Sequence, residues 1–417
     1  MYPNPQDVLP LPPRPDLQQY KKQAKQLSKA CKARGQDGVR AWAAQWMAAA
    51  GDPFVEFAWE KLSSSGKCAT SHAQYVMARA YGFLSWPAFV RHIDELQRAT
   101  LTVGAFEAAA DAIVAGDLAT LKELLRGDPS LVHARSTREH RSTLLHYVAA
   151  NGVENYRQKT PPNIIAIAET LLKAGAEVDA VAEMYGGNAT TLGLAATSIH
   201  PLRAGVQNAL IDVLLEHGAQ MDWPGGAGRT VSIVTGCLAN GRGEAAKYLA
   251  LRGASLDLES ASGVGRLDLV RACFNTDGTL TDGATPDQMR DGFTWACEFG
   301  RTDVVEFLLD RGMDVAAKLP RNHGQTGLHW AAFGGHISTV QLLLNRHAPL
   351  ETTDDSYGGT PLSWALHAWG NEPQGSPDRY YRVVEMLVAA GATVEPEWIQ
   401  HPAIQADVKM VAALSGH

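Results

Sequence analysis

One phrase of about ten residues recurs along the chain and limits the possible fold more than any other feature of the sequence. It joins the end of an apolar helix to a turn of small residues, as in LLKAGAEVDA, LLEHGAQMDW and LALRGASLDL. Its copies, one of them worn, begin at residues 124, 171, 214, 249, 308, 343 and 387. Such self-similarity predicts a repeat protein, in which each unit buries its apolar face only by stacking on its neighbours.

The most complete unit is GQTGLHWAAFGGHISTVQLLLNRHAPLE, residues 324–351. It resembles the ankyrin repeat, and the segments STLLHYVAANG (142–152) and GGTPLSWAL (358–366) match the front half of the same pattern. The resemblance covers residues 104–396 and implies antiparallel helix pairs joined by extended turns. Small alanines let such helices approach closely, and a glycine after the second helix supplies a left-handed stop. We therefore expect an all-α ankyrin-repeat solenoid.

A constant interval inside the units counts the repeats and locates three insertions. Eight residues separate the glycine of the mid-repeat turn from the first position of the recurring phrase in four copies. Gly265 and Cys273 keep this interval, which predicts an eroded repeat whose first helix is nearly lost. The total is about eight repeats. Insertions at 153–163, 197–205 and 370–380 fall between the two helices of their repeats, so we expect them at one edge of the solenoid.

Residues 16–100 precede the repeats and predict a small helical domain that caps the first of them. A proline-rich extended N-terminus, residues 1–15, comes before it, and residues 397–417 predict a C-terminal helical cap. The domain at 16–100 is similar to the N-terminal region of many bacterial ankyrin proteins, a resemblance that implies an architecture but no activity. A helix-turn-helix that binds DNA is the alternative for its YGFLSWP turn, although the following helix offers few donors that could read bases.

Charge is divided unevenly along the chain. Residues 1–100 carry 13 Lys or Arg and 8 Asp or Glu. The remaining residues carry 24 Lys or Arg and 36 Asp or Glu. This acidic excess argues against nucleic acid as a partner of the repeats. We expect no membrane partner either, because the chain shows neither a signal peptide nor an apolar run of about 18 residues.

The five cysteines are scattered, without the spacing of a metal site. They predict free buried thiols in a reducing compartment, and hence a cytoplasmic protein. Motifs for a cofactor or a metal ion are missing from the sequence, so we expect neither.

Ligand-binding residues are predicted in two sets. The first lies in the insertion at 153–163, where Tyr156, Arg157 and Lys159 would suit a carboxylate or a phosphate. The alternative is that Arg157 and Lys159 only tie the loop to acidic neighbours such as Glu154. Most of the second set lies on the concave surface that the resemblance implies: Asn151, Tyr185, Phe299, His323, Phe333 and Tyr357. Its other two members, Trp330 and Trp364, follow the TPLH position of their repeats, and for them packing is the alternative.

Two functions are compatible with these features. The first is a cytoplasmic interaction protein whose concave groove binds a protein or peptide partner, which is the common use of the fold. The alternative is a protein that binds a small organic or anionic ligand, or an enzyme of the hydrolase, lyase or isomerase class. Its site would combine the groove with the three inserted loops, and its weak catalytic candidates are His140, Glu298 and His367.

Overall fold

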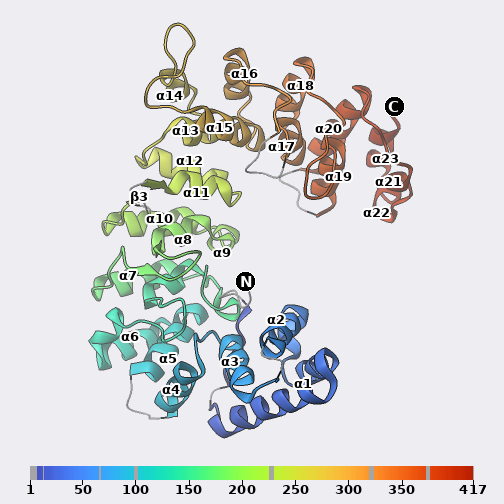
Figure 1. Ribbon diagram of the computed structural model, residues 1–417. Coiled ribbons are helices and arrows are strands. Elements are labelled where there is room, and N and C mark those ends of the chain that lie inside the picture. The colour runs from blue at the N-terminus through green and yellow to red at the C-terminus, as the bar shows by residue number, and fades with distance from the viewer. Residues whose placement is uncertain are drawn as a thin grey trace. The chain divides into compact units, whose positions relative to one another are not determined.

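The computed structural model describes residues 7–12, 14–64, 67–97, 102–224, 230–318, 324–371 and 376–416. It divides into two compact units, Met1–Met221 and Asp222–His417, and each is described by itself. Helices make up most of both units, and the described strands pair as two short hairpins. The predicted all-α fold is confirmed (Figure 1). Among the described residues, no helix combines the length and the apolar character that crossing a bilayer requires.

The first unit begins with four α-helices: α1 (Leu17–Trp46), α2 (Gly51–Ser63), α3 (Thr70–Ala80) and α4 (Trp86–Gln97), with a short 3-10 helix η2 (Ala48–Ala50) after α1. Helix α1 begins at a cap, because the Asp16 carboxylate accepts a hydrogen bond from the backbone N–H of Gln18. Its apolar face packs into an aromatic core, where the Tyr20 ring meets Tyr81 and Phe89 edge-on at 5.3 and 5.1 Å.

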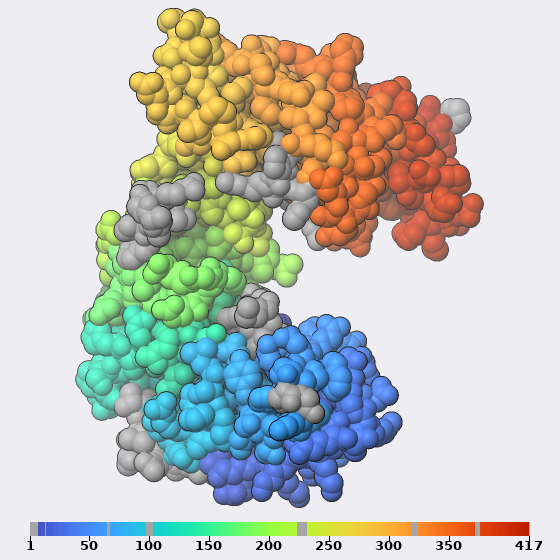
Figure 2. Space-filling model, viewed as in Figure 1, coloured from blue at the N-terminus to red at the C-terminus, as the bar shows by residue number. Residues whose placement is uncertain are grey.

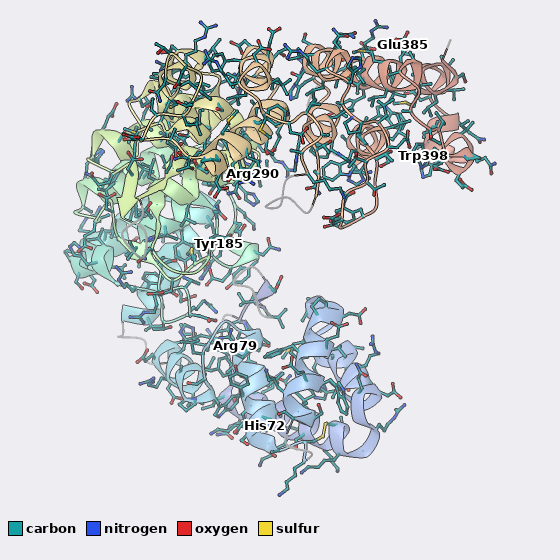
Figure 3. The ribbon with its side chains drawn as sticks, turned by 45° about the horizontal axis from the view of Figure 1, so that its top comes forward. His72, Arg79, Tyr185, Arg290, Glu385 and Trp398 are labelled. Atoms are coloured by element: carbon teal, nitrogen blue, oxygen red, sulfur yellow. A yellow bond between two sulfur atoms is a disulfide. The ribbon has the colours of Figure 1, made fainter. Side chains whose placement is uncertain are left out.

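A disulfide joins Cys31 on α1 to Cys68 before α3, with 5.9 Å between the Cα atoms (Figure 3). The prediction of five free thiols is therefore wrong for this pair, because the packing of α1 on α3 brings together two cysteines that lie 37 residues apart. Cys273 and Cys297 are free thiols, and Cys237 is buried. Disulfides persist mainly in oxidising surroundings, so the cysteine argument for a cytoplasmic location no longer holds.

Three helix pairs follow in the first unit: α5 (Thr102–Ala115) with α6 (Leu118–Gly127), η4 (Leu144–Ala149) with α7 (Ile164–Lys173), and α8 (Thr191–Thr197) with α10 (Gln207–Glu216). Short elements lie between the helices: η3 (Pro129–His133), η5 (Asn155–Arg157), α9 (Ile199–Arg203) and the antiparallel strands β1 (Val181–Ala182) and β2 (Ala189–Thr190). In the space-filling view the N-terminal helices in blue and the first repeats in cyan form one continuous surface (Figure 2).

The second unit opens with strands β3 (Asp222–Pro224) and β4 (Thr230–Ser232) and contains five helix pairs: α11 (Ile233–Ala239) with α12 (Gly243–Leu251), α13 (Leu258–Val264) with α14 (Leu267–Ala272), α15 (Pro286–Glu298) with α16 (Thr302–Asp310), α17 (Gly327–Phe333) with α18 (Ile337–Asn345), and α19 (Pro361–Asn371) with α20 (Pro377–Ala389). The expectation that the eroded repeat nearly loses its first helix is wrong. Its first helix is α13, and the Asp257 carboxylate caps it by accepting a hydrogen bond from the N–H of Ser260 at 2.8 Å.

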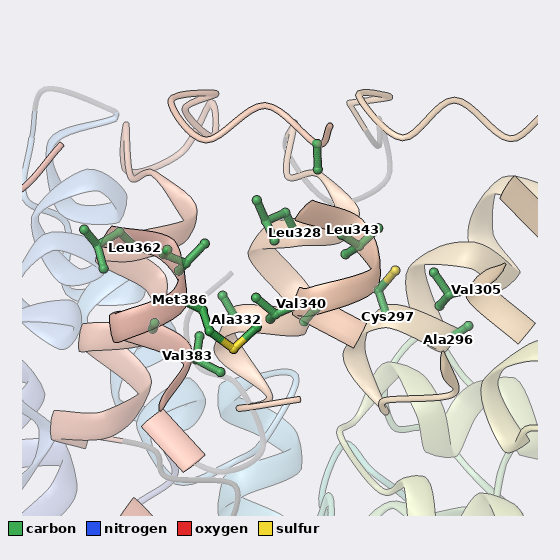
Figure 4. Packing of buried hydrophobic residues seen from close by; sticks show 14 of the residues in the cluster. Ala296, Cys297, Val305, Leu328, Ala332, Val340, Leu343, Leu362, Val383 and Met386 are labelled. Atoms are coloured by element: carbon green, nitrogen blue, oxygen red, sulfur yellow. The ribbon is translucent and has the colours of Figure 1, made fainter. Parts of the chain in front are cut away.

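One hydrophobic core runs through the stacked pairs of the second unit from α13 onward, and Figure 4 shows part of it. The first helices contribute small residues such as Ala296 and Ala332, whereas the second helices contribute branched ones such as Val305 and Leu343. Small residues facing branched ones let neighbouring pairs pack without gaps. Three short helices, α21 (Pro396–Gln400), α22 (Pro402–Gln405) and α23 (Val408–Ser415), follow the last pair, and their Ile404, Met410 and Leu414 join this core.

Candidate functional site

The insertion at 153–163 packs into the first unit instead of extending from it. Glu154 is 0% exposed and Arg157 is 3% exposed. Arg157 Nε donates a hydrogen bond to Asp111 Oδ1 at 2.8 Å, and its Nη1 lies 2.9 Å from Glu107 Oε2. Nη1 also lies 3.4 Å from Glu154 Oε1. Because Glu107 and Asp111 belong to α5, Arg157 ties the insertion to the preceding repeat, which is the alternative that the sequence left open.

A second buried arginine, Arg138, lies in the turn before η4. Its Nη2 is 3.2 Å from Glu107 Oε2, and its Nε is 2.5 Å from Glu154 Oε1. Its Nη1 donates a hydrogen bond to the carbonyl oxygen of Tyr81 at 2.9 Å. We call Glu107, Arg138, Glu154 and Arg157 the buried ionic cluster. It joins the N-terminal helices, the first repeat and the insertion.

Further bonds hold the N-terminal helices against the same turn. Arg79, labelled in Figure 3, forms an ion pair of 2.6 Å with Glu139. The backbone N–H of Glu139 donates to the carbonyl oxygen of Gly82 at 3.0 Å. His92 Nδ1 and Thr137 Oγ1 share a hydrogen bond of 2.7 Å. The N-terminal helices therefore dock on the repeats through polar contacts.

The two carboxylates of the buried ionic cluster are ionised at neutral pH. Burial favours the neutral acid, but Arg138, His140 and Arg157 outweigh it and hold the pKa of Glu154 below its usual range. Burial likewise opposes the ionisation of Glu107, yet Arg138 and Arg157 lower its pKa overall. Four charges in the interior are tolerated because each lies against an opposite one. Removing one member would therefore leave an opposite charge buried with fewer partners, and both arginines already face carboxylates of this chain.

The three catalytic candidates do not share one unit of the structure. His140 belongs to the first unit and is 2% exposed; its Nδ1 shares a hydrogen bond of 2.8 Å with Ser142 Oγ, and its Nε2 lies 3.5 Å from Glu154 Oε1. Glu298 ends α15 and His367 lies on α19, and α17 packs between those helices. Burial raises the pKa of Glu298 to about 8, so this side chain is protonated at neutral pH. A shared catalytic site for them stays a prediction without supporting geometry.

Several of the predicted ligand-binding aromatic residues meet in the second unit. The rings of Trp330, Phe333 and Trp364 lie edge to face, with centroids 5.3 to 6.1 Å apart. All three are half-buried. Phe299 is also half-buried, and its ring lies 6.5 Å from that of Trp295. We call Trp330, Phe333 and Trp364 the aromatic cluster, because they give the first helices of adjacent repeats a common apolar surface.

The loop before α19 is held in one conformation by a single carboxylate. Asp354 Oδ1 accepts hydrogen bonds from the backbone N–H groups of Ser356 and Tyr357 at 2.9 and 2.8 Å. Asp354 Oδ2 accepts from the N–H of Gly359 at 2.8 Å and from Trp364 Nε1 at 3.1 Å. Burial opposes ionisation of this carboxyl, but these hydrogen bonds hold the pKa of Asp354 below its usual range. Tyr357 lies in this loop and is 86% exposed.

Two predicted residues of the first unit also contact each other. Tyr185 lies in the turn between β1 and β2 and is 60% exposed, and its hydroxyl donates a hydrogen bond to Asn151 Oδ1 at 2.8 Å. Asn151 Nδ2 donates to the carbonyl oxygen of Leu194 and to Thr197 Oγ1, each at 3.1 Å. Lys159 is exposed. The binding roles of these residues stay predictions.

The second insertion and Tyr156 also pack within the first unit. At the start of the 197–205 insertion, Ser198 Oγ donates a hydrogen bond to the carbonyl oxygen of Ala150 at 3.2 Å, so this segment packs on the preceding repeat. Tyr156 is half-buried, with its hydroxyl 3.4 Å from Arg138 Nη2. His323 and residues 372–375 of the third insertion lie outside the described residues.

Arg138, Glu107 and Asp354 are central to these arrangements, and none was predicted as a site residue. A local signal existed for Asp354, because an aspartate just before a Ser-Tyr-Gly-Gly turn is typical of a side chain that accepts hydrogen bonds from the turn's own backbone. Arg138 and Glu107 had no such signal, because their contacts join segments 31 residues apart.

Comparison with known proteins agrees with the repeats. Residues 293–397 match the family model for ankyrin repeats, in three copies. These residues are ankyrin repeats, and they include the aromatic cluster, Asp354 and Tyr357. The fold is an all-α ankyrin solenoid. The match does not extend to residues 16–100, so the similarity of that domain to bacterial proteins stays a prediction.

Individual relatives match only short stretches. Inversin from Danio rerio is 38% identical over 65 residues, which is 16% of this chain and 6% of that protein. Protein fem-1 homolog A-like from Mus musculus is 39% identical over 67 residues, 16% of this chain and 10% of that protein. The chain thus spans a tenth or less of these relatives. The human ASB11 ankyrin repeat domain, a solved structure, aligns with a TM-score of 0.34 at 22% identity, covering 69% of this chain and 99% of that domain.

Proposed function

We propose that this ankyrin-repeat chain is an interaction protein that binds a protein or peptide partner through the concave groove of its repeats, with Tyr357 and the aromatic cluster at the centre of the contact. One observation carries the proposal: the Asp354 carboxylate makes four hydrogen bonds that order a loop whose Tyr357 side chain is 86% exposed. An aromatic ring that an ordered loop holds in solvent is available to contact a partner.

Two physical effects make an exposed tyrosine on an ordered loop suitable for binding a protein partner. Tyrosine is one of the residues that most often carry the affinity of a protein interface, because its ring is large and its hydroxyl can be hydrogen-bonded. A loop that is ordered before binding loses little conformational entropy on binding. Trp364 donates to Asp354 and also belongs to the aromatic cluster, so the exposed ring and the apolar surface are held by the same carboxylate.

The charge of the second unit indicates the kind of partner. Residues 222–417 carry 15 Lys or Arg and 23 Asp or Glu, a balance of −8. Complementary charge speeds association and suppresses unsuitable partners. We therefore propose that the bound segment is basic and presents an apolar side chain to the aromatic cluster.

The small-molecule or enzyme alternative lacks comparable support. The insertion at 153–163 places Arg157 against carboxylates of its own chain, and the insertion at 197–205 packs on the preceding repeat. We therefore do not extend the proposal to a bound metabolite or a reaction.

Replacing Tyr357 with alanine tests the proposal. We expect Tyr357→Ala to weaken partner binding roughly tenfold or more, because the ring would leave the centre of the interface. The full chain, used as bait in an extract of its source cells and analysed by quantitative mass spectrometry, would identify partners that the variant loses. Calorimetry with the purified partner then gives the change in Kd.

Leu251→Ala is the matched control, since Leu251 ends α12 and is 81% exposed. It should retain every partner, and both variants should melt at the wild-type temperature. If the partners of the wild-type chain remained bound to Tyr357→Ala with unchanged Kd, the proposed surface would be rejected.

A further inference from the structure

Four lysines form a stripe along the exposed side of α1: Lys22, Lys25, Lys29 and Lys32. With 3.6 residues per turn and a rise of 1.5 Å per residue, they fall within about 80° of one another around the helix and span about 15 Å of its axis. The buried residues of the same helix, such as Tyr20 and Leu27, lie on the opposite side. We call these four residues the lysine stripe.

The part of α1 that carries the stripe lacks carboxylates, because residues 17–36 contain neither Asp nor Glu. Along the described part of the sequence, the ion pair nearest to the stripe joins Arg40 to Asp52, beyond its last lysine. The four ammonium groups therefore face solvent as a continuous positive surface on a protein whose formal net charge is −7.

Helix stability does not explain this arrangement. Like charges three or four residues apart repel each other on a helix surface, and the lysine stripe contains three such neighbouring pairs. A kink at Gly35 ends the helical segment that carries the stripe, so the helix dipole favours Lys32 near its C-terminal end, but the repulsion between neighbouring lysines remains. Exchanging Lys25 for a glutamate would relieve that repulsion, so the uniform sign of the stripe indicates an external partner.

The helix that carries the stripe is held rigidly. The disulfide between Cys31 and Cys68 attaches α1 to the segment before α3, and Ser28 Oγ donates a hydrogen bond to the carbonyl oxygen of Cys68 at 2.5 Å. Asp16 caps the N-terminal end of α1. The lysines are therefore presented at a constant spacing, which favours a partner with a matching regular spacing of negative charge.

We propose that the lysine stripe binds an acidic segment of a second protein, one that presents about four carboxylates along about 15 Å, as an acidic face of a helix does. This surface is separate from Tyr357 and does not depend on the function proposed for the repeats. A lipid surface fits less well, because the apolar side of α1 is buried in the domain core. Nucleic acid fits less well, because the stripe lacks arginine and the balance of −12 beyond residue 100 repels a long polyanion.

The experiment uses the full chain and a fluorescent twelve-residue peptide with glutamates spaced alternately three and four residues apart among alanines. Its binding is followed by fluorescence anisotropy at low salt. The test variant carries Lys22→Gln, Lys25→Gln, Lys29→Gln and Lys32→Gln. The control removes four exposed positive charges elsewhere: Arg91→Gln, Lys122→Gln, Arg126→Gln and Arg203→Gln.

We expect the stripe variant to bind the peptide roughly tenfold or more weakly, and the control to stay within about twofold of wild type. Wild-type binding should also weaken with added salt. The proposal is overturned if wild type does not bind the peptide, or if the control loses as much affinity as the stripe variant. It is also overturned if a DNA duplex or vesicles of anionic lipid bind the stripe more tightly than the peptide. None of these outcomes affects the Tyr357 test, because the stripe variant retains that surface.

Discussion

Replacing Arg138 with alanine should lower the free energy of unfolding of the first unit by about 3–5 kcal/mol. The substitution leaves Glu107 and Glu154 buried with one cation fewer, and it removes the bond to the carbonyl oxygen of Tyr81. For a unit of this size, the melting temperature should fall by about 10 °C. Urea denaturation followed by circular dichroism measures the change in free energy.

Arg126→Ala is the matched control, because Arg126 is an exposed arginine in the last turn of α6. It should change the stability by less than about 0.5 kcal/mol. Adding Glu154→Gln to the Arg138 variant should recover part of the loss, since the second substitution removes a buried charge that the first leaves with one cation fewer. An Arg138 variant as stable as the control would contradict a stabilising role for the buried ionic cluster.

Acidification from pH 7 to pH 4 should destabilise the first unit strongly. Burial lowers the pKa of His92 to about 4, and burial likewise lowers that of His146 to about 4, from an ordinary value of 6.5. Both imidazoles are neutral in the folded chain and take up protons on unfolding, so stability is full above pH 6.5 and is lost as the pH falls towards 4. Each histidine should contribute a loss of about 3 kcal/mol by pH 4.

Urea denaturation at a series of pH values tests this expectation. His92→Gln should flatten the dependence between pH 6.5 and pH 4, because the glutamine does not titrate. His133→Gln, the same change at an exposed histidine, is the matched control. Equal stability of the wild-type chain at pH 7 and pH 4 would show that these histidines are not held neutral by the fold.

The sequence was sufficient to predict the stacked helix pairs, because each repeat carries its own pattern of small and branched residues. The repeat pattern did not predict two local features, the helix α13 and the 3-10 form of η4. Helix α13 forms from LESASGV, which lacks the TPLH phrase but begins after a capping Asp257. The first helix of the second repeat is the 3-10 helix η4, which ends where Ala150 adopts a positive φ of 48°. Caps and turns are set by single side chains, so a repeat pattern does not reveal them.

The environment of the insertion could be stated from the sequence only as two alternatives. Whether Arg157 faces a ligand or its own chain depends on Glu107 and Asp111, which lie on α5, 50 and 46 residues earlier. The distance along the chain carries no information about that contact. By contrast, Tyr357 and Trp364 were predicted from their positions in the repeat, but the hydrogen bonds that they donate to Asp354 depend on the loop's conformation.

Hydrogen exchange of the full chain with and without its purified partner tests the proposed function most directly. If the partner binds the proposed surface, the amides of residues 354–367 should exchange more slowly in the complex. The amides of residues 153–158 should be unchanged, because that segment is already packed against α5. Protection confined to residues 153–163, with none at 354–367, would contradict the proposed interface.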